Sequence, residues 1–423
     1  MLEKLFKLKE HNTNPKTEIT AGIVTFMTMA YILVVQPSFM GAAGMDVGAV
    51  TVVTAILSAI FSLFMGLYAN LPFALAPAMG SNAFFAFTLV AGGVVSWQTG
   101  LGMVFISGVV FLLLSVLGLR EVIVKLIPKN VKLAIGAAVG FYIVSLGFKN
   151  GGIMQIDGSI SMGDIKTPAV LLTIIGLCLL VFLMSRKVKG AVFIGIIATT
   201  IIGIPMGITQ VPEALISMPP SIEPIFMKLD IMGALKWSFF PLIFTFFVGD
   251  FFSTLGTLIG VSAKADLLDE EGNLPNIEKP FLVDSIATIV GALFGSTVVT
   301  TYIESASGVE EGGRTGLTAV STAVCFALAP IVGMIPNQAT APALIIIGLM
   351  MLSGLKDIDF SDFTESFPAF ATIAFTIFTN SISNGISMGI IAYMFTKVMA
   401  GKYKELNWGI YILSIPLILY FLI

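Results

Sequence analysis

Long apolar runs recur along the whole chain, and they constrain its fold more than any other feature. Twelve of them approach the roughly 20 residues that a helix needs to cross the hydrocarbon core of a bilayer. A final run, 407–423, predicts an extra short helix in or along the membrane. Apolar residues make up 57% of the chain and charged residues only 11%, against roughly 25% charged residues in a soluble domain. The sequence therefore predicts an all-α membrane protein. The twelve predicted spans are 17–37, 48–69, 99–118, 131–148, 168–184, 190–208, 237–261, 281–296, 315–335, 340–353, 366–381 and 384–400.

Two further apolar segments, 72–91 and 297–312, are interrupted by residues that a continuous helix does not tolerate. Pro72 and Pro77 break the first, and the β-branched run 297–301 favours extended backbone in the second. Each segment then continues into a short helical pattern. We therefore expect a short strand followed by a half-helix in both, which brings the number of membrane crossings to about fourteen.

The distribution of positive charge tests this count, because cytoplasmic loops of membrane proteins carry an excess of Lys and Arg. With the N-terminus in the cytoplasm, 18 of the 22 Lys and Arg residues fall on the cytoplasmic side. A miscount by one span would scramble this asymmetry. The sequence therefore predicts a multi-pass protein of the inner (plasma) membrane with a cytoplasmic tail at 1–16. The four residues on the outer side are Lys149, Lys166, Lys228 and Lys236.

Short matches in the same order indicate that the chain consists of two related halves. Seven crossings per half is an odd number, so the second half must be inverted relative to the first, as in many secondary transporters. The two broken segments take corresponding places, third in each half. The matches are 23–26 with 243–246, 99–101 with 315–317, and Ile127-Pro128 and Gly140 with Ile335-Pro336 and Gly348.

The two broken segments predict a binding site at membrane depth. Non-helical backbone is stable there only where protein or a water-filled cavity satisfies its N–H and C=O groups. Two facing segments would leave such groups near the midplane, beside the partial positive charge of helix N-termini. This environment suits a flat, polar solute that forms hydrogen bonds. The alternative is a pair of ordinary kinked helices.

Two acidic residues lie within apolar segments: Asp250 in the middle of a span and Glu304 at the start of the second half-helix. Burying a lone carboxylate costs several kcal/mol, or the group takes up a proton. Both residues are therefore candidates for carrying a proton or binding a substrate. The alternative is a neutral carboxyl that ties helices together by hydrogen bonds. Asp284, near the start of a span, is interpreted as a capping or surface acid at the cytoplasmic edge.

Several other classes of function are disfavoured. The only histidine, His11, lies in the polar N-terminal tail, and no nucleophile–base arrangement argues for an enzyme. Cys178 and Cys325 have no metal or redox spacing and are interpreted as core residues, so no cofactor is expected. A net charge of −3 argues against nucleic acid as a partner. A channel or a non-transporting receptor remains an alternative to a transporter.

Three stretches resemble signature motifs of the AzgA-like adenine/guanine/hypoxanthine permeases. They are residues 74–87 (ALAPAMGSNAFFAF), residues 250–260, and residues 300–318, which contain TTYIESASG followed by GGRTGLT. The resemblance runs from Phe6 to about Gly401. It implies the fold of the uracil and xanthine permeases, with seven plus seven inverted spans, and proton-coupled uptake of a purine nucleobase by an elevator-like alternating-access mechanism.

The resemblance also implies a division into two domains. A core domain that carries the substrate would comprise residues 17–118 and 237–335, and a gate domain would comprise 131–208 and 340–423. The implied coupling ion is the proton, with sodium left open. Uracil, xanthine or an inorganic anion remains an alternative substrate on the same fold. The sequence leaves open whether the chain forms a homodimer.

The binding residues of the family correspond to Asn82, Asp250 and Glu304 in this sequence. By the resemblance, one carboxylate hydrogen-bonds the purine ring N–H groups and a second acid couples to proton uptake, with Glu304 and Asp250 as the candidates. Phe84 and Phe251 are candidates for stacking on the base.

The chain departs from the family pattern at two places near this implied site. The family usually has a second Asp three residues after the first, where this chain has Ser253. It also usually has Gly and then Leu around the earlier motif, where this chain has Ala78 and Ser81. Ser253 is itself a candidate for binding the substrate, and the loss of one acid there is expected to alter the purine preference or the coupling ion.

Overall fold

A computed structural model of the protein describes residues 2–118, 129–157, 159–188, 190–209, 219–269, 274–328, 337–379 and 381–422. Each of the twelve predicted spans lies mainly on helix, but the first, 17–37, is divided between two helices by a turn at Ala30 and Tyr31. The end of the span at 315–335 and the repeat match at 127–128 and 335–336 lie outside the described residues. Within those residues, seven helical segments are long and apolar enough to cross a membrane, and the other apolar helices are shorter. The seven are Pro15–Ala42, Val47–Ala69, Trp97–Val116, Asn130–Asn150, Pro168–Ser185, Trp237–Lys264 and Gln338–Asp357.

Local sequence explains where several helices of the first half begin. α2 and α9 each begin with a proline. Proline is tolerated there because the backbone N–H that it lacks would have no partner within the first helical turn. Asn14, Asp46 and Ser96 cap α2, α4 and α6 by accepting a backbone N–H from three residues further on. The elements are α1 (Leu2–Phe6), α2 (Pro15–Met29), α3 (Ile32–Ala42), α4 (Val47–Phe64), η1 (Met65–Ala69), β1 (Leu75–Pro77), α5 (Met79–Ala83), η2 (Phe84–Val90), α6 (Trp97–Val116), α8 (Lys129–Asn150), β2 (Met154–Asp157), β3 (Ser159–Met162), α9 (Pro168–Ser185) and α10 (Ala191–Gly203).

The second half follows the same principles, and its last helix, α19, coincides with the final apolar run at 407–423. Gly295 ends α13 with φ of 85°, a conformation that favours glycine, and turns the chain towards β4. The elements are α11 (Ile231–Ala234), η3 (Trp237–Phe239), α12 (Phe240–Lys264), α13 (Glu278–Phe294), β4 (Val299–Thr301), α14 (Ser305–Glu310), α15 (Gly316–Leu328), α16 (Asn337–Met351), η4 (Leu352–Asp357), α17 (Phe363–Phe378), α18 (Ile382–Met399), η5 (Tyr403–Glu405) and α19 (Trp408–Leu422).

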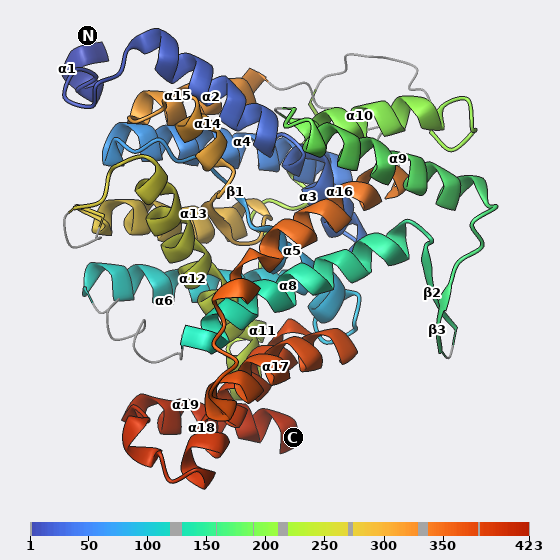
Figure 1. Ribbon diagram of the computed structural model, residues 1–423, viewed down its shortest axis with the longest axis vertical. Coiled ribbons are helices and arrows are strands. Elements are labelled where there is room, and N and C mark those ends of the chain that lie inside the picture. The colour runs from blue at the N-terminus through green and yellow to red at the C-terminus, as the bar shows by residue number, and fades with distance from the viewer. Residues whose placement is uncertain are drawn as a thin grey trace.

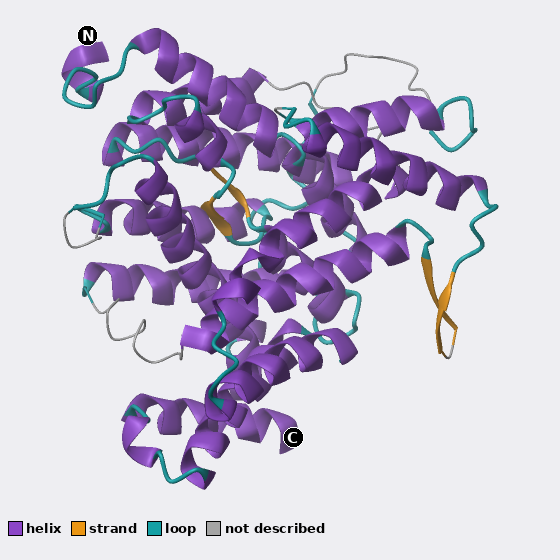
Figure 2. Ribbon diagram, in the orientation of Figure 1, coloured by secondary structure: helices purple, strands orange, loops and turns teal. Residues whose placement is uncertain are grey.

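The two broken segments pair with each other in the middle of the helical body, whereas the β2–β3 hairpin projects from its edge (Figure 2). β1 and β4 are antiparallel and fully buried. One further backbone hydrogen bond extends the ladder at each end, from Ala78 N to Val298 O (2.8 Å) and from Tyr302 N to Ala74 O (2.9 Å). Because α5 follows β1 and α14 follows β4, the prediction of a strand followed by a short helix is confirmed. The opposed pairs are Leu75–Thr301, Ala76–Thr300 and Pro77–Val299.

The helices form two packed groups (Figure 1). The strand-bearing group consists of α2, α4, α6, α12, α13, α14 and α15, which surround β1 and β4. The second group consists of α8, α9, α10, α16, α17, α18 and α19. α3 contacts α4 and α5 on one side and α16 on the other, so it connects the two groups.

Facing glycines allow α8 and α16 of the second group to cross closely. A Cβ on Gly140 would lie 2.7 Å from the Gly348 carbonyl oxygen, and a Cβ on Gly348 would lie 2.5 Å from that of Gly140. Larger residues would push the two helices apart, as at other small-residue contacts in membrane proteins. These two glycines are also partners in the sequence match between the halves.

A buried carboxylate joins the start of the chain to the second half. Glu18 of α2 accepts hydrogen bonds from the backbone N–H groups of Arg314 (2.9 Å), Thr315 (3.2 Å) and Thr318 (3.2 Å), and from the Thr318 hydroxyl (2.6 Å). These N–H groups precede and open α15, where a helix leaves donors unpaired and favours negative charge. Glu18 therefore caps the N-terminus of α15, although Thr315 lies 297 residues after it in the sequence.

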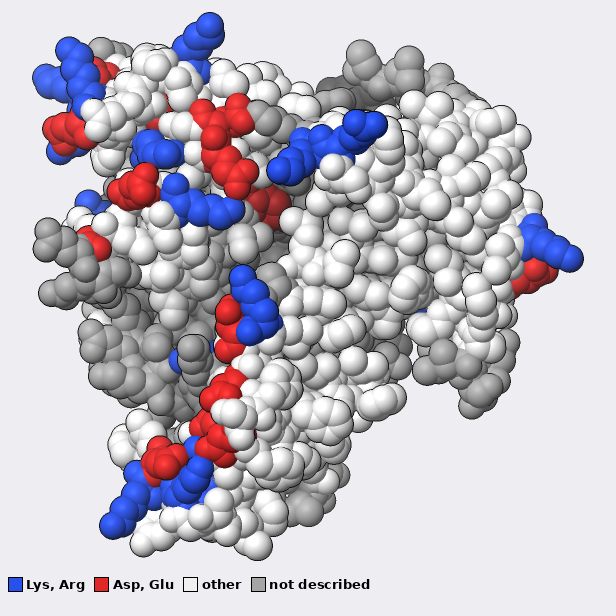
Figure 3. All heavy atoms as spheres, viewed as in Figure 1, with Lys and Arg blue, Asp and Glu red and all other residues white. Residues whose placement is uncertain are grey.

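Charged side chains occupy only part of the surface. On the face shown in Figure 3 they gather on the left, while the area over α9, α10 and α16 carries almost none. Cys178 on α9 is exposed and Cys325 on α15 is half-buried, so the interpretation of both as core residues is wrong. Apolar residues of a membrane protein face lipid as well as the core, and hydropathy does not separate the two environments.

Candidate functional site

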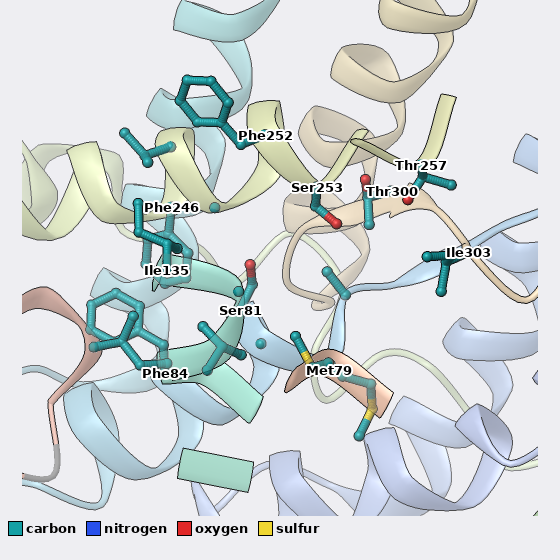
Figure 4. Close-up of a pocket in the computed structure, with 18 of the residues that line it drawn as sticks. Met79, Ser81, Phe84, Ile135, Phe246, Phe252, Ser253, Thr257, Thr300 and Ile303 are labelled. Carbon is teal, nitrogen blue, oxygen red and sulfur yellow. The ribbon is translucent and has the colours of Figure 1, made fainter. Parts of the chain in front are cut away.

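A cavity of about 260 Å³ lies between the two groups of helices, beside the central strands (Figure 4). One wall comes from α12, the start of α5, and β4 with the residues that follow it. The other wall comes largely from α8, α16 and α18. Ligand sites commonly form in such clefts between separately packed units.

Hydroxyl groups and a carboxylate concentrate on the wall formed by the strand-bearing group. Ser253 and Thr257 lie four residues apart on α12, which places them on the same helix face. Thr300 and Thr301 come from β4, and Glu304 comes just before α14. Figure 4 shows Ser253, Thr257 and Thr300 on the same side of the cavity. This wall offers several hydrogen-bonding groups to one solute.

The remaining lining is mainly apolar. Phe84, Ile135 and Phe246 lie together on the other side of the close-up (Figure 4), and the rings of Phe84 and Phe246 are 5.0 Å apart. Lys132 is the charged residue on the α8 side, with its Nζ 5.2 Å from the centre of the Phe252 ring. The cavity thus combines apolar surface for a flat ring with polar groups for its edge.

Glu304 brings its carboxylate into the cavity from the turn between β4 and α14. The hydroxyl of Tyr31, which also lines the cavity, donates a 2.5 Å hydrogen bond to Glu304 Oε1. The neighbouring Tyr302 hydroxyl donates to the carbonyl oxygen of Pro77 at 2.5 Å and so ties this turn to β1. The carboxylate is therefore held in a defined orientation, in which it can accept an N–H from a solute.

Of the six site residues that the sequence predicts, Phe84, Ser253 and Glu304 line the cavity. Asn82 and Phe251 are buried behind its wall and are not among the lining residues. The Asn82 side chain accepts a hydrogen bond from the Thr297 hydroxyl and donates one to the Pro77 carbonyl oxygen (3.5 Å).

The Phe251 ring belongs to a cluster of aromatic side chains away from the cavity. Its centre lies 5.6 Å from that of Phe111 on α6 and 5.4 Å from that of Phe281 on α13. These three rings hold α12 against α6 and α13. Because apolar residues cover nearly every face of α12, the sequence alone does not separate a ring in this cluster from a ring in the cavity.

Asp250, the sixth predicted site residue, forms a buried pair with Asp284 behind β4. Asp250 Oδ2 accepts a 2.7 Å hydrogen bond from the Thr288 hydroxyl. Asp284 Oδ1 accepts one from Thr301 N (2.7 Å), and Oδ2 accepts one from the Thr254 hydroxyl (2.5 Å). The interpretation of Asp284 as a capping or surface acid is wrong, because its side chain is completely buried. Asp284 is buried because β4 folds back over α13, and this contact cannot be predicted from the sequence around Asp284.

A body of membrane-length helices around a polar and aromatic cavity is typical of a membrane transport protein. The Permease family model (Xan_ur_permease) matches residues 16–414, and the chain therefore belongs to this permease family. Its similarity to known permeases extends over the full length of the chain.

Two relatives illustrate that similarity. The adenine permease AdeP of Escherichia coli is 40% identical, over 99% of this chain and 95% of the relative. The guanine/hypoxanthine permease PbuG of Bacillus subtilis is 39% identical, over 100% of this chain and 99% of the relative. These relatives confirm the resemblance to adenine/guanine/hypoxanthine permeases, and they are transporters, not enzymes.

The fold is also found in a solved structure of distant sequence. The transmembrane domain of the cyanobacterial bicarbonate transporter BicA matches with a TM-score of 0.63 at 17% identity, over 87% of this chain and 96% of that domain. At this level of identity the likeness concerns the fold alone.

Proposed function

We propose that the protein takes up a purine nucleobase, namely adenine, guanine or hypoxanthine, across the plasma membrane by proton symport. The observation that carries the proposal is the Glu304 carboxylate, which faces a cavity with an aromatic wall in a chain related to purine permeases. A neutral purine has ring N–H groups for this carboxylate to accept, ring nitrogens for hydroxyl donors, and a flat face. In this proposal Glu304 binds the ring edge, Ser253 and Thr300 add hydrogen bonds, and Phe84 packs on the ring.

The proposal includes fourteen crossings in two inverted halves, with the N-terminus in the cytoplasm. Two contacts support the relation between the halves, because each joins corresponding positions: β1 with β4, and Gly140 with Gly348. The core domain (17–118 and 237–335) would move relative to the gate domain (131–208 and 340–423). A cavity between the two groups of helices suits such alternating access, since a relative shift exposes it to either side.

Another solute on the same fold is the main alternative. Uracil and xanthine also present N–H groups and a flat ring. An inorganic anion is disfavoured, because a carboxylate, Glu304, and not a cation stands at the start of the second half-helix. A channel is a further alternative, but a channel cannot concentrate its solute.

Uptake of a panel of nucleobases into proteoliposomes tests the proposal. Labelled adenine, guanine, hypoxanthine, xanthine and uracil are supplied with and without an imposed pH gradient. We expect at least one of the three named purines to accumulate above its outside concentration when the outside is acidic, and to leak out when a protonophore collapses the gradient. Uptake that only equilibrates would indicate a channel, and uptake of none of these purines would refute the proposal.

A further inference from the structure

Asp250 and Asp284 place two carboxyl groups in contact within the strand-bearing group. They project from α12 and α13, are 1% and 0% exposed, and lie close enough to hydrogen-bond to one another. Asp250 Oδ1 is buried and receives no hydrogen bond from the residues that the structure describes. Two carboxylates in contact away from water cannot both be ionised at moderate cost. One proton between them supplies the missing donor and removes the repulsion.

The described surroundings of the pair contain no positive charge that could replace this proton. α4, α5, α6 and β4 all pack on α12 or α13, and none of them carries a charged residue. Four charged groups on or beside other neighbouring elements are engaged elsewhere. Glu304 faces the cavity with Tyr31, Lys132 of α8 lies over Phe252, Glu310 of α14 pairs with Lys264 (2.9 Å), and Lys397 of α18 lies between Glu365 and Glu405 (2.8 and 2.7 Å).

The threonine hydroxyls around the pair lie within hydrogen-bonding distance of its carboxyl oxygens. Those of Thr254 and Thr300 lie 2.5 and 3.1 Å from Asp284 Oδ2, and that of Thr288 lies 2.7 Å from Asp250 Oδ2. At these separations each hydroxyl can donate its hydrogen to a carboxyl oxygen. The cavity does not reach either aspartate, so water has no direct access to the pair through it.

β4 connects the carboxyl pair to the cavity. The Thr300 side chain lines the cavity, and its hydroxyl lies 3.1 Å from Asp284 Oδ2 and 2.8 Å from the Thr254 hydroxyl. Thr301 also lines the cavity and donates its backbone N–H to Asp284 Oδ1 at 2.7 Å. A solute that contacts this strand therefore contacts residues that hold Asp284 in place.

We infer that Asp250 and Asp284 together hold the coupling proton behind β4, and that Glu304 serves the nucleobase. The inference rests on the proposed proton-coupled transport. It adds Asp284 to the coupling site, as the partner that shares the proton with Asp250. Without the proton, two negative charges face each other and disturb α12, α13 and the strand that lines the site. Proton and nucleobase therefore favour each other's binding, because a coupling free energy between two sites is reciprocal.

The variant Asp284→Asn tests this assignment, because an amide keeps the shape of the side chain and cannot exchange the proton. The affinity of the purified protein for the best nucleobase is measured on both sides of neutral pH, together with proton uptake on binding, read from a pH-sensitive dye. In the wild type we expect the affinity to fall by up to about tenfold per pH unit as the proton is lost. In Asp284→Asn we expect binding to persist without pH dependence and without proton uptake, and a pH gradient no longer to drive accumulation.

Glu310→Gln is the matched control, since it makes the same change at an exposed salt bridge and is expected to keep the wild-type pH profile. If Asp284→Asn does not fold, Thr300→Val retains both acids, removes one hydroxyl donor to Asp284, and is expected to shift the pH at which the affinity falls. Wild-type proton uptake in Asp284→Asn, or an unshifted profile in Thr300→Val, would overturn the inference. Transport by the wild type that is driven by a sodium gradient instead of a pH gradient would also overturn the inference. A wild type that binds no nucleobase would refute the proposed function instead.

Discussion

The β1–α5 and β4–α14 segments share a backbone plan and differ in the chemistry that they bring to the cavity. β1 is Leu-Ala-Pro and leads to Phe84 on the apolar side. β4 is Val-Thr-Thr and leads to Glu304 on the polar side. Each strand satisfies the backbone of the other, so neither segment can form its part of the site alone. The comparison shows that the pairing builds the site, while β4–α14 supplies most of its hydrogen-bonding groups and β1–α5 leads to its aromatic packing surface.

The largest effect is expected from a change in β4–α14, the polar segment. Glu304→Gln removes the charge that strengthens hydrogen bonds to a nucleobase, worth about 1.5–3 kcal/mol or about 10- to 150-fold in affinity. We expect proteoliposome uptake to fall by at least this factor, with the thermal stability of the purified protein preserved. Glu310→Gln is the control at an exposed carboxylate. Wild-type uptake in Glu304→Gln would remove this residue from the mechanism.

The junction between the two segments is the next most sensitive point. Asn82→Ala removes the acceptor of the Thr297 hydroxyl and leaves that buried group without its partner. We expect a loss of stability of about 1–3 kcal/mol, measured as a lower melting temperature in detergent. Asn82→Asp keeps an acceptor oxygen and is expected to be less damaging to this hydrogen bond. If Asn82→Ala melts like the wild type, the amide does not join the segments.

The apolar side of the cavity is expected to contribute less to nucleobase affinity than Glu304. Two phenylalanines test this contribution as a matched pair. Phe84→Leu removes a ring from the cavity wall, and we expect nucleobase affinity to fall by about two- to tenfold, or about 0.5–1.5 kcal/mol. Phe251→Leu acts within the cluster with Phe111 and Phe281, so we expect lower stability and an unchanged affinity. Equilibrium binding and melting curves separate these outcomes. The reverse pattern would mean that the ring of Phe251, not of Phe84, packs on the base.

Ser253→Asp is expected to have the smallest effect. Ser253 is exposed in the cavity, so the change in stability is expected to stay within about 0.5 kcal/mol. A carboxylate can only accept hydrogen bonds, which favours bases with an exocyclic amino group. We expect uptake of adenine and guanine to rise severalfold relative to hypoxanthine in competition assays, whereas Ser253→Ala leaves the ratio unchanged. An unchanged ratio in both variants would place Ser253 outside the contact with the base.

The broken segments could be predicted because their signals are local. Pro72 and Pro77 exclude a continuous helix, and the run of β-branched residues before Tyr302 favours extended backbone. The pairing of the two strands could be expected from their corresponding positions in the two halves. Most helices were equally accessible, because the length of an apolar run measures a span directly. The division of the first run into α2 and α3 was not predicted.

Other features depend on contacts between distant parts of the chain. Asp284 resembles an acid at the edge of a span, and only β4 folded over α13 reveals its burial. Glu18 is likewise buried against residues of the second half. The different surroundings of Phe84 and Phe251 also escape the sequence, because both residues lie in uniformly apolar stretches.

The pairing of β1 with β4 has a consequence for biogenesis. A ribosome delivers β1 more than 200 residues before β4. At about 5–20 residues per second, the first strand waits on the order of 10–40 s for its partner. During that time its backbone groups and the Glu18 carboxylate have no partners in lipid, where unpaired polar groups are costly. The first half therefore has to wait where water or the insertion machinery can reach it, and truncation before β4 should leave it a target for membrane quality control.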